Sequence, residues 1–147
     1  MSAPLPFPRA AAVQATAGMA APPAAGLAIL VWSADWRQPE RAATPFVTAQ
    51  AAAALELQVE LLFTAEAVQW LLPERAGDLL GFGAGRLSAG AYLQTTAALG
   101  VRLLACSQAL HAAGRRPEDL VPACAGLGGI TAFVARGHAP GWSTLVF

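Results

Sequence analysis

The sequence predicts an α/β domain in which a mostly parallel, five-stranded sheet lies between two layers of helices. From residue 26 onward, short apolar runs alternate with helix-forming segments along the chain. Glycine, proline or a helix-capping residue separates most of these segments. Right-handed crossovers place the helices of such a chain on both faces of a parallel sheet, which is the three-layer α/β/α, flavodoxin-like arrangement.

The first predicted strand is the continuous apolar run 27–32 (LAILVW), a pattern typical of a strand that is covered on both faces. A helical segment follows and extends to about Leu55. Pro39 and Pro45 are the two candidates for its first-turn proline, and Thr44 would cap the helix if it began at Pro45.

Residues 58–63 (QVELLF) form the second predicted strand. Thr64 can cap a short helix that ends before Pro73. The following segment, 73–87, is the longest predicted loop. Its stretch "GFGAGR" resembles a phosphate-binding loop only superficially, because it lacks the G-x-x-x-x-G-K pattern and does not follow a strand.

Ser88 is expected to begin the next helix, and Gly100 is expected to end it in a left-handed conformation. Residues 101–105 (VRLLA) then form the third strand. A helix is predicted over 107–113, because Gly114 stops it.

The last part of the chain is expected to hold two more strands and one helix. The fourth strand is predicted over 120–125 and the helix over 126–136, closed by Gly137. The last strand covers 142–147 (WSTLVF).

Residues 1–25 are rich in alanine and proline and carry one charge, Arg9, so they are expected to form a disordered tail before a domain over 26–147. A secretory signal is the alternative, but polar and glycine residues such as Gln14 and Gly18 dilute its apolar region.

Composition limits the classes of function. The chain has 147 residues, which suits one domain, and it is 56% hydrophobic and 12% charged, which predicts heavy burial or assembly into an oligomer. A formal net charge of zero argues against nucleic-acid binding. No apolar run approaches the roughly 20 residues that span a membrane.

Cysteine and histidine content limits the chemistry. Two cysteines do not make a disulfide framework, so a reducing compartment, the cytoplasm, is expected. The two histidines and two cysteines do not show the spacing of a metal site, and none is predicted.

Cys106 stands where the strand 101–105 meets the helix 107–113. The first amides of a helix are unpaired donors and carry a partial positive charge, which stabilises a thiolate. A free cysteine is also a common small hydrophobic residue in protein cores. The residues alone therefore leave a reactive and a structural Cys106 both open.

Four segments from Leu27 to Phe147 resemble the DsrE/DsrF-like family of small sulfur-handling proteins. The most specific is "LGVRLLACSQALHAAGRRPEDL", in which Gly-Val leads a strand to Ala-Cys-Ser and a helix that ends at glycine. The other three are "LAILVWSADWRQPERAATPFVTAQAAA", "QVELLFTAEAVQWL" and "CAGLGGITAFVARG".

The resemblance implies that Cys106 carries a persulfide in a sulfur relay between donor and acceptor proteins, in a trimer or hexamer and without an organic cofactor. Whether the protein turns over as a sulfurtransferase stays open. Cys124 departs from the family pattern, in which an aliphatic residue is more usual at that position. It is either a structural thiol or a redox partner of Cys106.

The fold also predicts which residues accompany Cys106, since ligand sites of such sheets lie outside the carboxyl ends of the strands. Asp35 either orients a partner thiol or caps the following turn. The residues expected to line one pocket are Ser33, Asp35, Trp36, Phe63, Thr64, Ser107 and Gly126.

The rival hypothesis is a non-catalytic, oligomeric α/β binding module in which Cys106 only fills space. Thiol reactivity separates the two hypotheses, because a buried structural cysteine reacts slowly with an alkylating agent.

Overall fold

Five parallel strands form the central sheet of the computed structural model, which describes residues 26–33, 35 and 37–147. The predicted tail, residues 1–25, lies outside the described residues. In space the strands run in the order β6-β5-β2-β1-β7. Their bounds are β1 Gly26–Val31, β2 Gln58–Phe63, β5 Arg102–Cys106, β6 Gly126–Gly128 and β7 Trp142–Val146.

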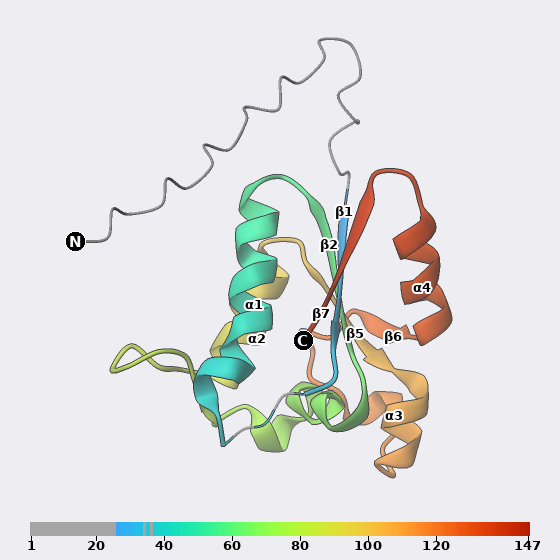
Figure 1. The fold of residues 1–147 in the computed structure, drawn as a ribbon. Coiled ribbons are helices and arrows are strands. Elements are labelled where there is room, and N and C mark those ends of the chain that lie inside the picture. The colour runs from blue at the N-terminus through green and yellow to red at the C-terminus, as the bar shows by residue number, and fades with distance from the viewer. Residues whose placement is uncertain (1–25, 34, 36) are drawn as a thin grey trace, which may run out of the picture.

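Helices cover both faces of this sheet, as the sequence predicts (Figure 1). The helices α1 and α2 lie on one face, and α4 lies on the other, while α3 lies beside the carboxyl end of β5 (Figure 1). Their bounds are α1 Pro39–Ala54, α2 Ala89–Ala98, α3 Ser107–Ala112 and α4 Ile130–His138. Short 3-10 turns complete the connections: η1 Ala65–Leu71, η2 Pro73–Arg75 and η3 Pro117–Asp119.

The main core lies between the sheet and the layer of α1 and α2. Alternate residues of a strand point to the same face, so every second residue of the three central strands enters this core. Phe46 of α1 links the two layers, with its ring centroid 5.7 Å from that of Phe63. The contributing strand residues are Leu27, Ile29, Val31, Val59, Leu61, Phe63, Leu103 and Ala105.

The opposite face is covered more thinly, because no residue of α4 is buried. Its Ile130 and Val134 remain exposed, and so does Leu127 on the neighbouring edge strand. We call these three residues the α4 surface. On the other edge strand, β7, Leu145 and Val146 are exposed as well.

The predicted boundaries of α2 are confirmed. The Ser88 hydroxyl accepts a hydrogen bond from the backbone N–H of Ala91 at 3.1 Å and caps the helix. Gly100 follows the helix with φ of +85°, a left-handed conformation that glycine adopts without steric cost.

The predicted helix up to about Leu55 is α1, and of its two candidate first-turn prolines Pro45 lies inside the helix. Pro39 occupies the first turn. The Thr44 hydroxyl donates to the backbone oxygen of Glu40 at 2.8 Å instead of capping a new helix. The helix tolerates Pro45 because packing of its buried face outweighs the lost hydrogen bond.

The predicted strand 120–125 and helix 126–136 are also displaced. The strand is β6, Gly126–Gly128, and the helix α4 begins at Ile130 and includes Gly137. A strand this rich in glycine lacks an apolar pattern, so pairing with β5 determines it.

The segment 73–87 is not a structureless loop. It contains η2 and a two-stranded antiparallel hairpin of β3 (Leu79–Leu80) and β4 (Leu87–Ser88). "GFGAGR" therefore belongs to a hairpin connection. Thr64 precedes η1 but makes no side-chain capping bond. In the described part of the chain, no helix is long and apolar enough to cross a membrane.

Candidate functional site

Cys106 is the last residue of β5 and immediately precedes α3. Its side chain is buried, with 2% of its surface exposed, yet it does not belong to the main core cluster. Strand alternation explains this, because Cys106 follows Ala105, which faces the core. The helix that begins beside the thiol, α3, is short and has six residues.

The edge strand β6 lies beside Cys106 and brings little side-chain bulk there. The Cα partner of Cys106 on β6 is Gly128. A Cβ built on Gly128 would lie 3.0 Å from Leu62 and 3.3 Å from Leu104, so the backbone of β6 packs closely against these side chains. β6 pairs with β5 through three residue pairs, so the strand next to the thiol is a short edge strand with few backbone pairings.

Cys124 occupies a different environment. Its thiol donates to the backbone oxygens of Leu103 at 3.5 Å and Gly126 at 3.4 Å. Burial raises the pKa of the Cys124 thiol, so it stays protonated near neutral pH. Both cysteines are free in the structure.

The ends of β1, β2 and β5 lie level at the carboxyl edge of the sheet. Their register places Trp32, Thr64 and Cys106 side by side as the chain leaves the paired region. Since neighbouring strands are about 4.8 Å apart, the backbones of Trp32 and Cys106 are separated by about 10 Å.

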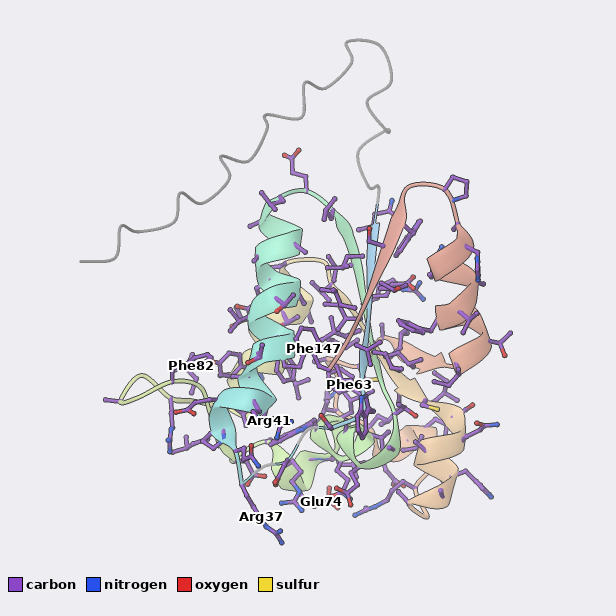
Figure 2. The ribbon with its side chains drawn as sticks, viewed as in Figure 1. Arg37, Arg41, Phe63, Glu74, Phe82 and Phe147 are labelled. Atoms are coloured by element: carbon purple, nitrogen blue, oxygen red, sulfur yellow. The ribbon has the colours of Figure 1, made fainter. Side chains whose placement is uncertain are left out.

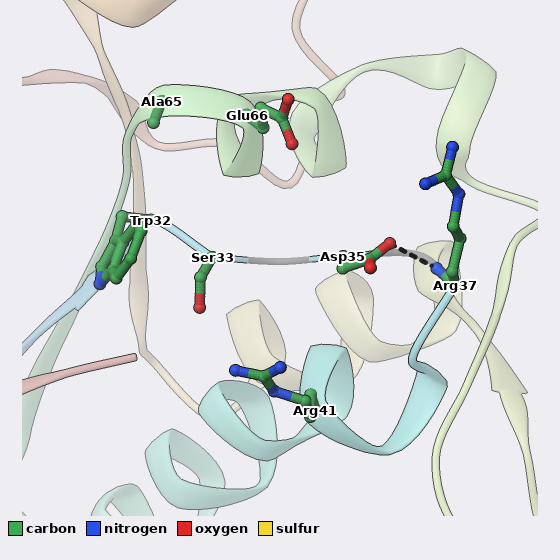
Figure 3. Close-up of a pocket in the computed structure, with 7 residues that line it drawn as sticks. All are labelled: Trp32, Ser33, Asp35, Arg37, Arg41, Ala65 and Glu66. Atoms are coloured by element: carbon green, nitrogen blue, oxygen red, sulfur yellow. Dashed lines mark hydrogen bonds between the residues drawn. The ribbon is translucent and has the colours of Figure 1, made fainter.

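A cavity of about 430 Å³ opens at this edge, beside β1 and the first turn of α1 (Figure 3). We call it the edge cavity. Figure 2 places Arg37 and Arg41 at the end of the molecule where α1 begins. The edge cavity is lined by Trp32, Ser33, Asp35, Arg37, Arg41, Ala65 and Glu66.

Two residues of the predicted pocket, Ser33 and Asp35, line the edge cavity. One carboxylate oxygen of Asp35 accepts a hydrogen bond from the backbone N–H of Arg37 at 2.9 Å, so Asp35 caps the turn. Thr64 is half-buried next to Ala65, a lining residue. Trp36 lies outside the described residues.

The structure places the other predicted residues elsewhere. Phe63 points into the core against Phe46, because it shares the strand face of Leu61. Gly126 begins β6 opposite Leu104 and so lies at the amino end of its strand, not at the carboxyl edge. Ser107 is exposed as the first residue of α3.

Sequence reasoning missed the charged part of the edge cavity: Arg37, Arg41 and Glu66. Arg37 and Arg41 closely follow the strand 27–32, and the carboxyl ends of parallel strands are where such sheets bind ligands, so this position is the signal that could have pointed to them. A second cavity of about 160 Å³ adjoins the first, since Ser33 and Arg41 line both, and Phe147 lines the second.

A further cavity of about 410 Å³ lies between α4 and the strands β5 and β6, lined by Leu104, Leu127 and Gly128 among others. Charged groups border it, because Glu60 accepts hydrogen bonds from Arg102 and Arg136. Among the residues that the structure describes, no group of three His, Cys, Asp or Glu side chains is placed to hold a metal ion.

Comparison with known proteins identifies the family. A model of the DsrE/DsrF-like family matches residues 27–140. No match was found among curated proteins. The family match covers β1 to the residues just after α4, and it includes Cys106.

Two solved structures share the three-layer fold. The first is a protein of unknown function, MTH1491 from Methanobacterium thermoautotrophicum, which is 17% identical with a TM-score of 0.63, over 82% of this chain and 97% of that chain. The second is the ychN protein from E. coli, which is 18% identical with a TM-score of 0.60, over 83% and 98% of the two chains. The fold is thus shared at low identity, and the match over residues 27–140 shows that the chain belongs to the DsrE/DsrF-like family.

Proposed function

We propose that this protein holds sulfane sulfur as a persulfide on Cys106 and delivers it to an acceptor protein. Membership of the DsrE/DsrF-like family suggests a role in sulfur relay. The observation that carries the proposal is the place of Cys106, which ends β5 at the carboxyl edge of the sheet and stands outside the main core.

The chemistry requires no oxidant. The Cys106 thiolate attacks the outer sulfur of a donor persulfide, R–S–SH. The S–S bond of the donor breaks, its electron pair leaves with the donor thiolate R–S⁻, and the transferred sulfur keeps its proton. A thiolate of the acceptor then attacks the outer sulfur on Cys106 and regenerates the Cys106 thiolate.

Transfer requires access to a thiol that is covered in this structure. We infer that displacement of β6 uncovers it, because Gly128 is the sheet partner of Cys106 and β6 pairs with β5 through three residue pairs. Edge segments with few contacts open locally at a lower free energy than the core. The proposal therefore includes opening of β6 during sulfur transfer.

The proposal also includes a homo-oligomer that covers the α4 surface. Ile130 and Val134, four residues apart on α4, are both exposed, and Leu127 on the edge strand β6 is exposed as well. Large apolar side chains exposed on a helix are a feature that an interface between subunits would cover. Oligomers of three or six copies are those expected from the family resemblance.

A second candidate function is a non-catalytic binding module, and the 2% exposure of Cys106 favours it. In that case the thiol packs as a small hydrophobic residue and reacts only on unfolding. The protein then acts through its cavities or its α4 surface.

Intact mass after incubation with polysulfide tests the proposal. We expect the native protein to gain the mass of one sulfur, and dithiothreitol to remove it. Cys106→Ser should lose the gain, whereas Cys124→Ser should keep it, because the raised pKa of Cys124 leaves that thiol protonated.

A folding control and two contrary outcomes complete the mass experiment. Circular dichroism of Cys106→Ser must show the native spectrum, so that loss of labelling does not reflect unfolding. A gain of sulfur that persists in folded Cys106→Ser, or no gain in the native protein, would overturn the assignment in favour of the binding module.

A further inference from the structure

We propose that the edge cavity binds a small molecule of the amino-acid type, with a carboxylate and an ammonium group, and that this molecule is the low-molecular-weight persulfide that loads Cys106. The loading of Cys106 by this molecule rests on the proposed function. Binding of the molecule rests only on the residues that line the edge cavity. The groups that recognise the ligand are Trp32, Ser33, Asp35, Arg37, Arg41 and Glu66.

Arg41 provides the carboxylate site. Its guanidinium donates to the side-chain oxygen of Gln38 at 3.0 Å, which restrains it at the cavity. Within the described residues, neither Arg41 nor Arg37 takes part in an ion pair. Figure 3 shows the Arg41 guanidinium on the same side of the cavity as Ser33, whose hydroxyl adds a second donor.

Asp35 and Glu66 provide the ammonium site. The backbone N–H of Arg37 occupies one oxygen of Asp35, and the second oxygen has no partner in the structure as described. Glu66 lines the cavity from η1, across from α1 (Figure 3). Two arginines and two carboxylates thus line one space, which matches a zwitterion better than a simple anion.

Two further lining residues, Trp32 and Ala65, add an apolar surface and a strained backbone to the cavity. Trp32 is 54% exposed, and its ring offers apolar area for the aliphatic part of a ligand. Ala65 has φ of +48°, a left-handed conformation that costs a non-glycine residue roughly 1–2 kcal/mol. Such strain gathers at ligand sites, and here it sets the position from which Glu66 enters the cavity wall.

Size and distance define the class of ligand. The volume of about 430 Å³ lies in the range of small-molecule sites. An extended tripeptide spans about 10 Å, which equals the separation of Trp32 and Cys106 along the sheet edge. Once opening of β6 uncovers the thiol, a persulfide of tripeptide size is therefore long enough to reach Cys106 while its charged groups stay in the edge cavity.

Calorimetry with S-methylglutathione tests binding without sulfur chemistry, since its blocked sulfur transfers nothing. We expect saturable binding to the native chain at a 1:1 ratio. Arg41→Gln should weaken it by about tenfold, because it removes a charge-assisted hydrogen bond. Arg86→Gln, which removes an exposed arginine on the hairpin, should bind like the native protein.

The outcomes separate this inference from the proposed function. Absence of saturable binding, or equal affinity in Arg41→Gln and native protein, overturns the inference even if polysulfide loads Cys106. Arg41-dependent binding with no sulfur transfer from glutathione persulfide overturns the donor assignment. Support requires both Arg41-dependent binding and loading of Cys106 that slows in Arg41→Gln at limiting glutathione persulfide.

Discussion

Glu60 and Arg136 join the sheet to α4 through two hydrogen bonds. The Nε and Nη2 atoms of Arg136 donate to the two carboxylate oxygens of Glu60 at 3.1 and 2.8 Å. Arg102 donates to the same carboxylate at 2.8 Å, and the Arg136 guanidinium lies 4.1 Å from the centre of the Trp142 ring. Because no residue of α4 is buried, this pair is a principal anchor of the helix.

Glu60→Gln should lower the free energy of unfolding at pH 7 by about 1–2 kcal/mol, since it removes the charge from this pairing. The hydrogen bonds from Arg136 hold the pKa of Glu60 below its usual range. A lowered folded-state pKa adds stability above the unfolded pKa of about 4.3, and this stability is lost as the pH falls through the folded value.

Urea denaturation at several pH values measures this effect. The difference between native protein and Glu60→Gln should stay constant from pH 7 to about 5 and shrink below about 4. Glu118→Gln is the matched control, because the Glu118–Arg116 pair is 3.9 Å apart and exposed. A difference that does not change with pH would contradict the role of the carboxylate charge.

Gly128→Ala should loosen the cover of Cys106. The added Cβ lies 3.0 Å from Leu62 and 3.3 Å from Leu104, so β6 must shift away from β5 at a cost of about 1 kcal/mol. That cost lowers the free energy of opening, so the rate of Cys106 alkylation by iodoacetamide should rise about fivefold.

Gly129→Ala provides the comparison for this experiment, because nothing lies within 4 Å of a Cβ at Gly129. Its alkylation rate should match that of the native protein. Equal rates in all three proteins would show that β6 does not control access to the thiol.

Val134→Glu should break the proposed homo-oligomer, because a charge would be placed in the apolar α4 surface, where Val134 is 51% exposed. Multi-angle light scattering is expected to give the mass of an oligomer for the native protein and a lower mass for the variant. Leu55→Glu, at a 76% exposed position after α1, should keep the native mass. A native protein that is monomeric at micromolar concentration would refute the interface.

Glu56→Gly should stabilise the protein. Glu56 follows α1 with φ of +64°, and its backbone N–H bonds to Ala53 at 2.9 Å, so the left-handed residue ends the helix. Glycine removes the steric cost of about 1 kcal/mol, which thermal unfolding would register as a rise of a few degrees. Glu56→Ala keeps a Cβ and should show no such rise.

Much of the fold was predictable because its signals are local. The apolar runs 27–32 and 58–63 identify buried strands without knowledge of their neighbours. Ser88 and Gly100 mark the ends of α2 through their own conformational preferences. The position of Cys106 between a strand and a helix followed from the same kind of signal.

The sequence by itself thus determined the class of fold, the chain positions of β1, β2 and β5, and the place of the candidate thiol between a strand and a helix, whereas the order of the strands in the sheet came from the tertiary structure. Tertiary structure decided the position of β6. This strand has the sequence Gly-Leu-Gly, which lacks the apolar pattern of a strand, and it forms through pairing with β5. Packing alone buries Cys106 and turns Phe63 into the core. Likewise, Arg41 and Glu66 line the same cavity only because the fold places α1 and η1 on either side of it, and these residues are distant in the chain.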